Sequence, residues 1–405
     1  MPVSPKTTDL QPKAVLPAND RAENAAVYVH WPFCEKKCPY CDFNSHVREK
    51  VDQASWQKAM LREIDTFAAH FPNLKAKSIF FGGGTPSLMP PETTALIIER
   101  IQSHWGGDAW IEITLEANPS SVEAARFYDY AQAGVNRVSV GVQSFKDQSL
   151  KFLGRLHNAH EATKALEVAR NNFDRVSFDL IYALPEQSLQ EWQTELQHAL
   201  GFSPSHLSLY QLTIEEGTAF YHQFNRGKFS LPDEELAATL FETTQLMTEN
   251  AGLPAYETSN HAKPGEQSAH NLAYWRGEPY VGIGPGAHGR LPGASVGAAY
   301  GHQQIKRPEN WLAAVEAFGC GLEKLEEIDR DERAVEAIMM GLRLREGICL
   351  PTFRDRFGLS AKEFLDNDAV SDLNTEGYLL ETQDRLTVTA KGAPLLNFLL
   401  PKIII

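Results

Sequence analysis

Short β-branched runs alternate with helical stretches along residues 26–251 of this 405-residue chain, and this alternation constrains the fold most strongly. The six runs are AVYVH (26–30), SIFFG (78–82), IEITLEA (111–117), RVSVGVQ (137–143), VSFDLIY (176–182) and HLSLYQL (206–212). The stretches between them carry apolar residues at helical spacing, such as Trp56, Met60, Ile64 and Phe67. Apolar runs of about five residues separated by amphipathic helices predict βαβ units and a parallel sheet buried on both faces.

Polar or glycine-rich residues stand at or shortly after the end of each run. They are Cys34, the glycines at 82–84, Glu116, Gln143, Asp179 and Gln211. The active sites of (β/α) barrels are assembled from the carboxyl ends of several strands, which favours a curled sheet over a flat, doubly wound one. We therefore expect an α/β fold with a partial (β/α)6 TIM-like barrel. With six units in place of eight, such a barrel is open at its side, and the opening suits a large substrate.

The pattern changes after residue 252, and we expect four segments. Residues 1–24 contain four prolines and are expected to form a flexible N-terminal segment, followed by the barrel over 25–252 and a His/Gly-rich extension of loops over 253–326. The run GYLLETQDRLTVTA (377–390) predicts a strand–turn–strand, so residues 327–405 are expected to form a smaller α+β, winged-helix-like domain. The acidic run EKLEEIDRDE (323–332) is interpreted as a solvated connection.

Composition narrows the classes of function and the compartment. The formal net charge of −14 argues against broad nucleic-acid binding, because a basic surface is needed to neutralise phosphates. No run approaches the roughly 20 apolar residues of a membrane span, and the first residues lack the apolar stretch of a signal peptide. Five cysteines in so long a chain do not form a disulfide framework. We expect a cytoplasmic protein, in which Cys320 and Cys349 are small apolar residues.

Three cysteines cluster in the segment CEKKCPYC, at Cys34, Cys38 and Cys41. Thiolates are soft ligands that suit iron–sulfur clusters or zinc. A [4Fe–4S] cube held by three thiolates leaves one iron open to another ligand, whereas a structural zinc ion normally closes with four ligands. A zinc site would need one more ligand, and His30 or His46 could supply it.

The spacing C-x3-C-x2-C, with Tyr40 just before the last cysteine, resembles that of the radical S-adenosylmethionine superfamily. The segment FFGGGTP (80–86) at the end of the second run strengthens the match, because glycines let a backbone approach a ligand closely. The resemblance implies a [4Fe–4S] cluster whose open iron is chelated by the methionine moiety of S-adenosylmethionine. Electron transfer from the cluster then gives a 5′-deoxyadenosyl radical.

The resemblance is closer to the branch that contains oxygen-independent coproporphyrinogen III oxidase and the heme chaperones of the HemW type. It rests on YVHWPFC, FGGGTP, LEANP, RVSVGVQSF, LGRLH and FDLIYALP, and it extends from about residue 25 to the C-terminus. By position, it implies that S-adenosylmethionine is contacted by Tyr28, Tyr40, Gly83, Gly84, Thr85, Glu116, Gln143, Arg155 and Asp179. The alternatives are a salt bridge at the barrel mouth for the two carboxyl groups and a solvated side chain for the arginine.

One position departs from the oxidase, and one hexapeptide matches the chaperones. Where the oxidase carries a further cysteine after the cluster ligands, this chain has Phe43. The element HNLAYW (270–275) matches the H-N-x-x-Y-W that marks the chaperone branch. His270 offers an imidazole to heme iron, while Tyr274 and Trp275 offer flat faces for a porphyrin. The alternative is a core histidine bonded to backbone, and the rival ligands are His261, His288 and His302.

The resemblance implies a heme chaperone that binds heme and transfers it to an acceptor protein, and a homodimer is compatible with this hypothesis. The alternative is an enzyme, a radical oxidase acting on coproporphyrinogen III, since a carrier has no obvious need for a complete S-adenosylmethionine site. The sequence leaves open which heme ligand is used, whether heme is held covalently and whether S-adenosylmethionine is turned over. It assigns no catalytic residue.

Overall fold

A large curved sheet dominates the computed structural model, which describes residues 14–106 and 110–405. Its strands are β1 (Glu23–Trp31), β4 (Leu74–Gly83), β5 (Glu112–Ala117), β6 (Arg137–Gln143), β7 (Arg175–Tyr182), β8 (His206–Gln211), β9 (Asn260–Ala262), β10 (Tyr280–Ile283), β11 (His288–Pro292), β12 (Ala299–Gln304) and β13 (Leu322–Ile328). The eleven strands are hydrogen-bonded in the order β13-β12-β11-β10-β1-β4-β5-β6-β7-β8-β9. The sheet therefore stays open between its two edge strands, β13 and β9.

All six predicted runs form strands of this sheet, and they pair in parallel from β1 to β8. The register places Val27 of β1 opposite Ile79 of β4 on one side and opposite Val281 of β10 on the other. Side chains of these strands are buried on both faces, as continuous apolar runs require. The predicted α/β fold with a partial barrel is confirmed, and β10 adds a further parallel strand that the sequence did not suggest.

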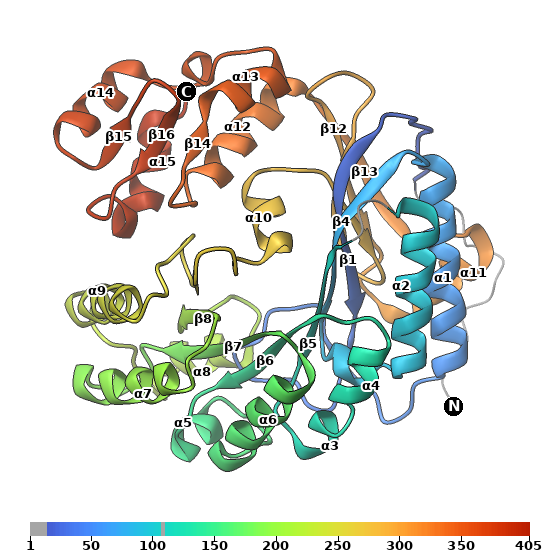
Figure 1. Ribbon diagram of the computed structural model, residues 1–405, viewed down its shortest axis with the longest axis horizontal. Coiled ribbons are helices and arrows are strands. Elements are labelled where there is room, and N and C mark those ends of the chain that lie inside the picture. The colour runs from blue at the N-terminus through green and yellow to red at the C-terminus, as the bar shows by residue number, and fades with distance from the viewer. Residues whose placement is uncertain (1–13, 107–109) are drawn as a thin grey trace.

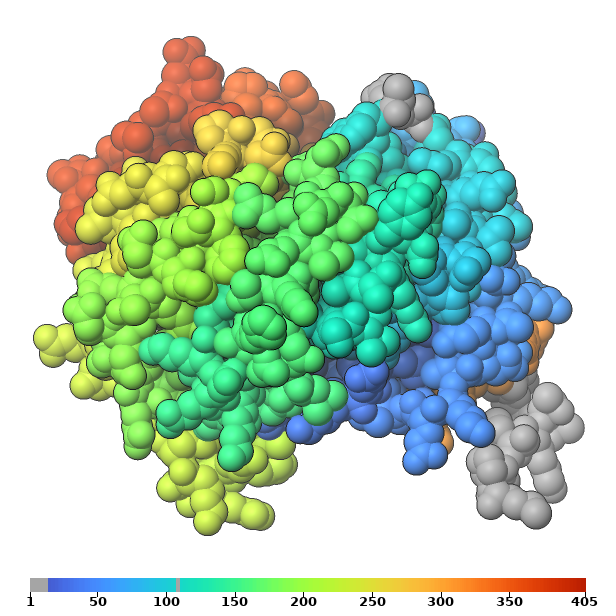
Figure 2. Space-filling view, turned by 60° about the horizontal axis from the view of Figure 1, so that its bottom comes forward, coloured from blue at the N-terminus to red at the C-terminus, as the bar shows by residue number. Residues whose placement is uncertain are grey.

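Helices cover the convex side of the sheet, and Figure 1 shows α1 and α2 on that side with α10 on the concave side. The helices of the βα series are α1 (Gln53–His70), α2 (Pro91–Trp105), α3 (Ser121–Ala124), α4 (Phe127–Gln132), α5 (Asp147–Phe152), α6 (Ala159–Asn172), α7 (Leu189–Gly201), α8 (Ala219–Asn225) and α9 (Glu234–Asn250), with a 3-10 turn at Pro86–Leu88. The predicted apolar stripe of α1 is buried. In Figure 2, the residues coloured green, which belong to this series, lie on the face turned toward the viewer.

Helix starts are fixed by local chemistry. In α6, the Asn158 side chain accepts a hydrogen bond from the backbone of Glu161, whose side chain accepts one from the backbone of Asn158. Ser188 and Glu191 make the same reciprocal pair at the start of α7. Such capping boxes satisfy backbone N–H groups that the first helical turn leaves without partners.

The extension over 253–326 contains more regular structure than the loops predicted from its sequence. It forms α10 (Ala269–Trp275), α11 (Pro308–Phe318) and strands β9 to β13. The strands β10, β11, β12 and β13 pair antiparallel in succession, so the extension widens the barrel sheet beyond β1. Most of the acidic run, interpreted as a solvated connection, lies in the edge strand β13. Charged side chains on an edge strand protect it from pairing with another chain.

The C-terminal part has a hydrophobic core of its own, built from residues between Ala334 and Ile403. Its elements are α12 (Arg330–Gly341), β14 (Ile348–Cys349), α13 (Leu350–Phe357), α14 (Asn367–Thr375), β15 (Leu379–Glu381), β16 (Arg385–Val388) and α15 (Leu396–Ile403), with 3-10 turns at Ala361–Phe364 and Ala393–Leu395. The predicted strand–turn–strand is present as β15 and β16, which join β14 in a small sheet. The limits of the four predicted segments stay predictions.

The described part of the predicted flexible segment packs against the body of the protein. Leu16 is buried in the main core. The side-chain nitrogen of Asn19 donates to the carbonyl oxygens of Pro292 and Gly293, both at 3.0 Å. Residues 1–13, which belong to the same predicted segment, lie outside the described residues. Among the described helices, none combines the length and apolar character needed to cross a membrane.

Candidate functional site

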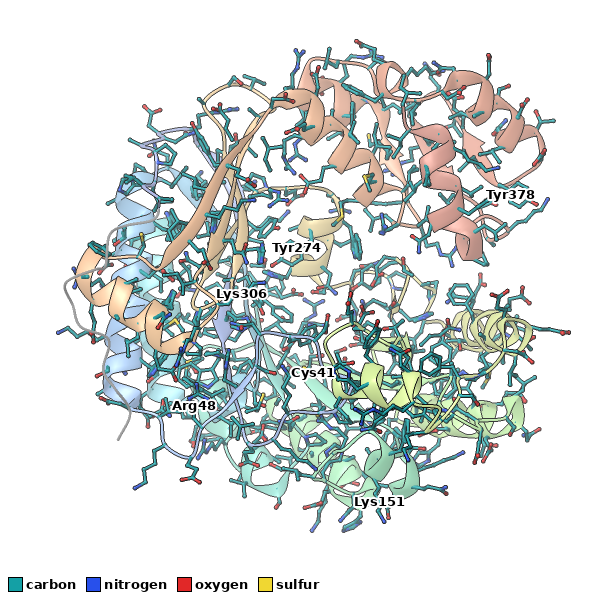
Figure 3. All side chains as sticks on the ribbon, turned by 180° about the vertical axis from the view of Figure 1, so that it is seen from behind. Cys41, Arg48, Lys151, Tyr274, Lys306 and Tyr378 are labelled. Carbon is teal, nitrogen blue, oxygen red and sulfur yellow. The ribbon has the colours of Figure 1, made fainter. Side chains whose placement is uncertain are left out.

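Of the three predicted cluster ligands, Cys34 ends β2 (Phe33–Cys34), and Cys38 and Cys41 lie on the loop that leads from it to β3 (His46–Val47). These two short strands pair in parallel, so the loop is closed at its base. Cys34, Cys38 and Cys41 are half-buried, form no disulfide and line one cavity of about 190 Å³, which we name the thiol cavity. Figure 3 shows Cys41 in the middle of the molecule. The structure thus brings the three thiols to one place.

Hydrogen-bond donors surround the thiols. Sγ of Cys41 lies 3.8 Å from Oγ of Ser45, and Nη1 of Arg155 donates to Sγ of Cys38 at 3.5 Å. Burial raises the pKa of Cys34 and Cys41, so these thiols keep their protons until a metal displaces them. The nearby donors then stabilise the thiolate charge that metal binding creates.

The zinc alternative lacks the fourth ligand that it requires. Both ring nitrogens of His30 are engaged, Nδ1 with the hydroxyl of Tyr28 at 3.0 Å and Nε2 with the carbonyl oxygen of Asn44 at 2.9 Å. Nε2 of His46 lies 3.1 Å from Oδ1 of Asn44. Within 14–106 and 110–405, no three Cys, His, Asp or Glu side chains are grouped to hold a single ion. A cube with its irons at separate corners fits the three thiols better.

Two glycines at the end of β4 let this strand approach the cysteine loop. Gly83 has φ of +114°, and a Cβ there would lie 2.6 Å from the ring of His30. A Cβ on Gly84 would lie 2.7 Å from the carbonyl oxygen of Phe33 and 3.0 Å from Sγ of Cys34. Packing around the thiols therefore requires glycine at both positions.

Two half-buried residues, Glu116 and Asp179, direct their carboxyl groups to the thiol cavity from β5 and β7. Burial and the charge of Asp179 raise the pKa of Glu116 to about 8. Burial also raises the pKa of Asp179, whose Oδ1 accepts a hydrogen bond from Ser139 at 3.3 Å. Arg137 pairs with Glu112, and no lysine or arginine of the described ranges lies at salt-bridge distance from either carboxyl group. A cationic ligand would let both groups ionise.

Arg155 is held at the wall of the same cavity with incomplete hydrogen bonding. Its Nη2 donates to Oδ1 of Asn118 at 2.5 Å and to the carbonyl oxygen of Gly141 at 3.0 Å. Its Nε is buried without a partner in the described ranges, and so is Oε1 of Gln143. Two unpartnered polar atoms on one wall fit a polar ligand that supplies the missing groups. Sequence reasoning missed Asn118, although it follows the predicted Glu116 by two residues at the same strand end.

The structure brings together most of the predicted contacts of S-adenosylmethionine. Those that line the thiol cavity are Tyr40, Gly83, Gly84, Thr85, Glu116, Gln143, Arg155 and Asp179. Tyr28 lies outside it. The geometry and the donor set therefore fit a small polar cofactor beside an iron–sulfur cluster.

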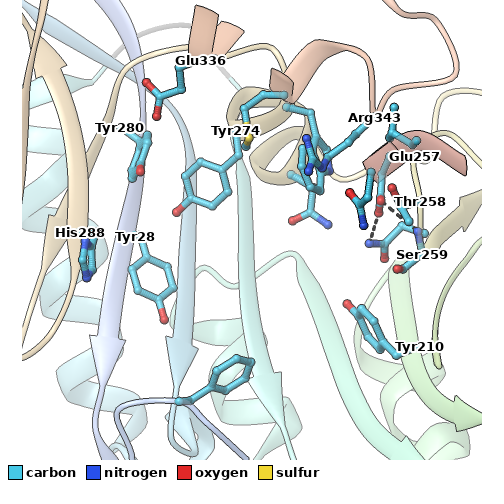
Figure 4. Close-up of a pocket in the computed structure, with 18 of the residues that line it drawn as sticks. Tyr28, Tyr210, Glu257, Thr258, Ser259, Tyr274, Tyr280, His288, Glu336 and Arg343 are labelled. Atoms are coloured by element: carbon cyan, nitrogen blue, oxygen red, sulfur yellow. Dashed lines mark hydrogen bonds between the residues drawn. The ribbon is translucent and has the colours of Figure 1, made fainter. Parts of the chain in front are cut away.

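A second cavity of about 1270 Å³, which we name the large cavity, adjoins the thiol cavity. Phe43, Gly83 and Glu116 line both. Its walls contain several aromatic side chains, among them Trp275 and the four labelled in Figure 4, which are Tyr28, Tyr210, Tyr274 and Tyr280. Drug-sized ligands occupy cavities of about 300–1,000 Å³, so the large cavity admits a broad flat molecule.

His270 does not face the large cavity, although Tyr274 and Trp275 of the same hexapeptide line it. Its Nδ1 lies 3.1 Å from Oγ of Ser78, and its Nε2 lies 2.9 Å from the hydroxyl of Tyr274. The ring stacks on Phe80 with the centroids 4.8 Å apart, and burial lowers its pKa to about 3. The expected free imidazole is thus engaged on both nitrogens, because α10 packs this face onto β4. Of the rivals, His288 lines the cavity, whereas His261 and His302 are buried elsewhere.

Comparisons with known proteins give two matches to domain families and a set of curated relatives. The radical SAM superfamily matches residues 28–199, and the HemN C-terminal domain matches residues 328–395. The heme chaperone HemW of Escherichia coli (strain K12) is 37% identical over 377 residues, which cover 93% of this chain and 97% of that protein. Radical S-adenosyl methionine domain-containing protein 1, mitochondrial, of Mus musculus is 38% identical over 388 residues, covering 93% and 86%.

A solved structure agrees with the fold. The radical SAM enzyme coproporphyrinogen III oxidase (HemN) from Escherichia coli superposes with a TM-score of 0.78, covering 94% of this chain and 90% of that one. Its sequence identity of 21% shows likeness of fold alone. The curated relatives are more similar in sequence and are matched over nearly their whole length. The chain therefore belongs to the heme chaperone HemW family of the radical SAM superfamily.

Proposed function

We propose that this protein is a heme chaperone, which binds heme and transfers it to an acceptor protein. The observation that carries the proposal is the 37% identity to the heme chaperone HemW of Escherichia coli over 97% of that protein. The large cavity supports it, because its aromatic side chains offer flat apolar faces to a porphyrin. Heme is then cargo, which has to enter and leave.

Membership of the radical SAM superfamily implies a [4Fe–4S] cluster and S-adenosylmethionine beside this cargo. Cys34, Cys38 and Cys41 would hold the cluster, which when bound supplies an electron to S-adenosylmethionine. Glu116 and Asp179 would face the cationic part of that ligand, since their carboxyl groups gain most from a positive charge. The remaining groups of the thiol cavity position the ligand and keep water from the thiols.

The partners and the compartment belong to the same proposal. Handover requires an acceptor protein, whose identity the described residues do not specify, and a homodimer is one form in which the cluster region could be covered. A reducing compartment such as the cytoplasm keeps the thiols available for iron.

An oxidase acting on coproporphyrinogen III is the second candidate. The observation in its favour is the thiol cavity, which offers a set of polar contacts for S-adenosylmethionine that a carrier has no obvious need for. The observation against it is Phe43, which stands where the oxidase carries a further cysteine. Anaerobic assay of the reconstituted protein with dithionite, S-adenosylmethionine and coproporphyrinogen decides between them, because only the oxidase gives protoporphyrinogen.

Heme transfer tests the chaperone directly. Protein loaded with hemin is mixed with apomyoglobin and separated by gel filtration, and the Soret absorbance of each fraction is followed in time. We expect this protein to transfer heme to apomyoglobin faster than serum albumin does when it is loaded with the same amount of hemin, because serum albumin releases heme passively. Equal rates, or no binding of hemin by the full chain, would contradict the proposal.

A further inference from the structure

An axial ligand of heme iron must reach the heme and must keep a nitrogen lone pair free, and these two requirements sort the histidines near the large cavity. His270 fails the second requirement, because both its nitrogens bond to side chains. His30 lines the large cavity, but its ring nitrogens bond to Tyr28 and Asn44. Neither can bind iron without breaking a buried hydrogen bond.

Two further histidines fail the first requirement. Nδ1 of His261 lies 3.0 Å from Oγ1 of Thr248, and the side chain is buried. His302 is also buried, and its Nε2 accepts a hydrogen bond from the backbone of Gly282 at 3.3 Å. Neither side chain lines the large cavity.

His288 meets both requirements. It begins β11 and lines the large cavity, where Figure 4 shows it beside Tyr28 and Tyr280. Its ring makes no hydrogen bond with any residue that the structure describes. Partial burial, together with the charges of Lys306 and Arg290, lowers its pKa, which favours the neutral imidazole and the lone pair that a metal requires.

The backbone around His288 explains a glycine of the segment GIGPGAHG (282–289). A Cβ on Gly282 would lie 2.1 Å from the carbonyl oxygen of His288, so only glycine lets β10 and β11 lie this close. On its other side, His288 is in register with Gln303 of β12. The histidine is thus held between two strands of the sheet rather than on a mobile loop, which suits a ligand that has to meet iron in a fixed direction.

A cation in the large cavity complements this ligand. Three arginines line the cavity, and two of them, Arg290 and Arg333, pair with Glu336. Arg343 donates to the carbonyl oxygen of Met339, and no carboxylate of the described ranges lies at salt-bridge distance from it. A guanidinium group without a carboxylate partner is a suitable site for the propionate groups of heme.

We propose that His288 is the axial ligand of heme iron in the large cavity and that Arg343 faces the propionates. Figure 4 places Tyr274 between these two side chains, where its ring can lie against the porphyrin. The inference rests on the proposed function and assigns the site of its cargo. Tyrosine ligation is the rival chemistry, but burial raises the pKa of Tyr280, which disfavours the phenolate that heme iron binds.

The absorption spectrum of the hemin-loaded full chain tests this assignment. His288→Gly should lose the Soret and visible bands of histidine ligation. Its affinity for hemin should fall by at least roughly 10- to 100-fold, which is the loss that a metal site shows when a residue supporting one of its ligands is removed. Added imidazole should restore the wild-type bands by filling the space that His288 vacates. His160→Ala, on the exposed face of α6, is the matched control and should leave the spectrum unchanged.

Two further variants keep the test decisive. His288→Cys should give the spectrum of thiolate ligation, and it answers the question if His288→Gly does not fold. Arg343→Gln should weaken hemin binding without changing the bands. A wild-type chain that binds no hemin overturns the proposed function together with this inference. A wild-type chain that binds hemin while both His288 variants keep its spectrum overturns the ligand assignment alone.

Discussion

The two adjoining cavities differ in size and in the share of aromatic side chains in their walls. The thiol cavity is small, about 190 Å³, and its walls carry charged and polar groups, some of which have no partner among the described residues. The large cavity has a volume of about 1270 Å³, and aromatic side chains line it together with charged ones. The walls of the thiol cavity come mainly from loops at the carboxyl ends of consecutive strands. The walls of the large cavity also include residues of α9, α10, α12 and the start of α15.

This difference separates a resident cofactor from an exchangeable cargo. Unpartnered buried polar atoms favour a ligand that stays, because its departure leaves them without hydrogen bonds again. A wide cavity with aromatic walls favours a flat ligand through the contact area between the rings and the ligand. Such contacts are less directional than hydrogen bonds and are compatible with release of the ligand. We therefore expect changes in the thiol cavity to affect the cluster and S-adenosylmethionine, and changes in the large cavity to affect heme.

The largest expected effect comes from removing the thiols. Replacing Cys34, Cys38 and Cys41 by alanine should abolish the iron and sulfide that anaerobic reconstitution adds, because these three thiols are the ligands proposed for the cluster. The three cysteines do not line the large cavity, so one hemin per chain should still bind. Iron, sulfide and Soret titrations measure both quantities. Simultaneous loss of hemin would show that the two cavities act as one site.

The next effect concerns stability rather than ligands. His270→Ala leaves the hydroxyl groups of Ser78 and Tyr274 without their buried partner, and it should lower the free energy of unfolding by roughly 2–4 kcal/mol. Urea denaturation of the heme-free protein measures this change, with His160→Ala as the exposed control. Folded His270→Ala should retain the histidine-ligated heme spectrum. Loss of that spectrum would indicate that His270, and not His288, is the axial ligand.

The sequence predicted the thiol cavity better than the large cavity for a physical reason. The three thiols share one loop, and Glu116 and Asp179 stand at the ends of strands whose order in the barrel follows the chain. Neighbouring parallel strands place their carboxyl ends at the same edge of the sheet, so the proximity of these residues follows from the strand order alone. The spacing of residues within one segment was therefore enough to name the three thiols, whereas the resemblance to a known family named the other groups that meet there.

The large cavity depends on contacts between distant segments, which no local pattern reveals. Arg343 and Tyr210 belong to different parts of the chain and meet the same space only because the extension widens the sheet and the C-terminal part borders it. The glycines that permit the close strands of the extension also weaken their β signal, so these strands were expected as loops. Within HNLAYW, residue types alone could not tell that the helix turns His270 inward and Tyr274 toward the cavity.

A moderate effect on the thiol cavity should follow from the proton on Glu116. Its folded pKa of about 8 lies above its ordinary value of 4.5, so the folded protein holds this proton more tightly than the unfolded chain. Stability is therefore lost as pH rises from 4.5 to 8. Glu116→Gln removes that loss, so the variant should gain stability relative to wild type between pH 5 and pH 8 in urea denaturation.

The same variant should weaken the cofactor. Without the carboxylate, the affinity for S-adenosylmethionine should fall roughly tenfold, or about 1.4 kcal/mol, because a charge-assisted contact is lost. Isothermal titration of the cluster-loaded protein measures this affinity, and hemin binding should be unaffected. A stability difference that does not change with pH, or an unchanged affinity, would speak against a protonated Glu116 in the thiol cavity.

The smallest effect on stability, and the sharpest test of the boundary between the cavities, concerns Phe43. Its side chain is 59% exposed and lines both cavities, so Phe43→Ala should change the free energy of unfolding by no more than about 0.5 kcal/mol. Removing the ring opens a path from the large cavity to the thiols, and the cluster should bleach faster in air. Bound hemin should slow this bleaching again, because it fills the space beside the gap. Phe398→Ala, at a position 62% exposed on α15, is the control. Bleaching at the wild-type rate would mean that the ring does not separate the two ligands.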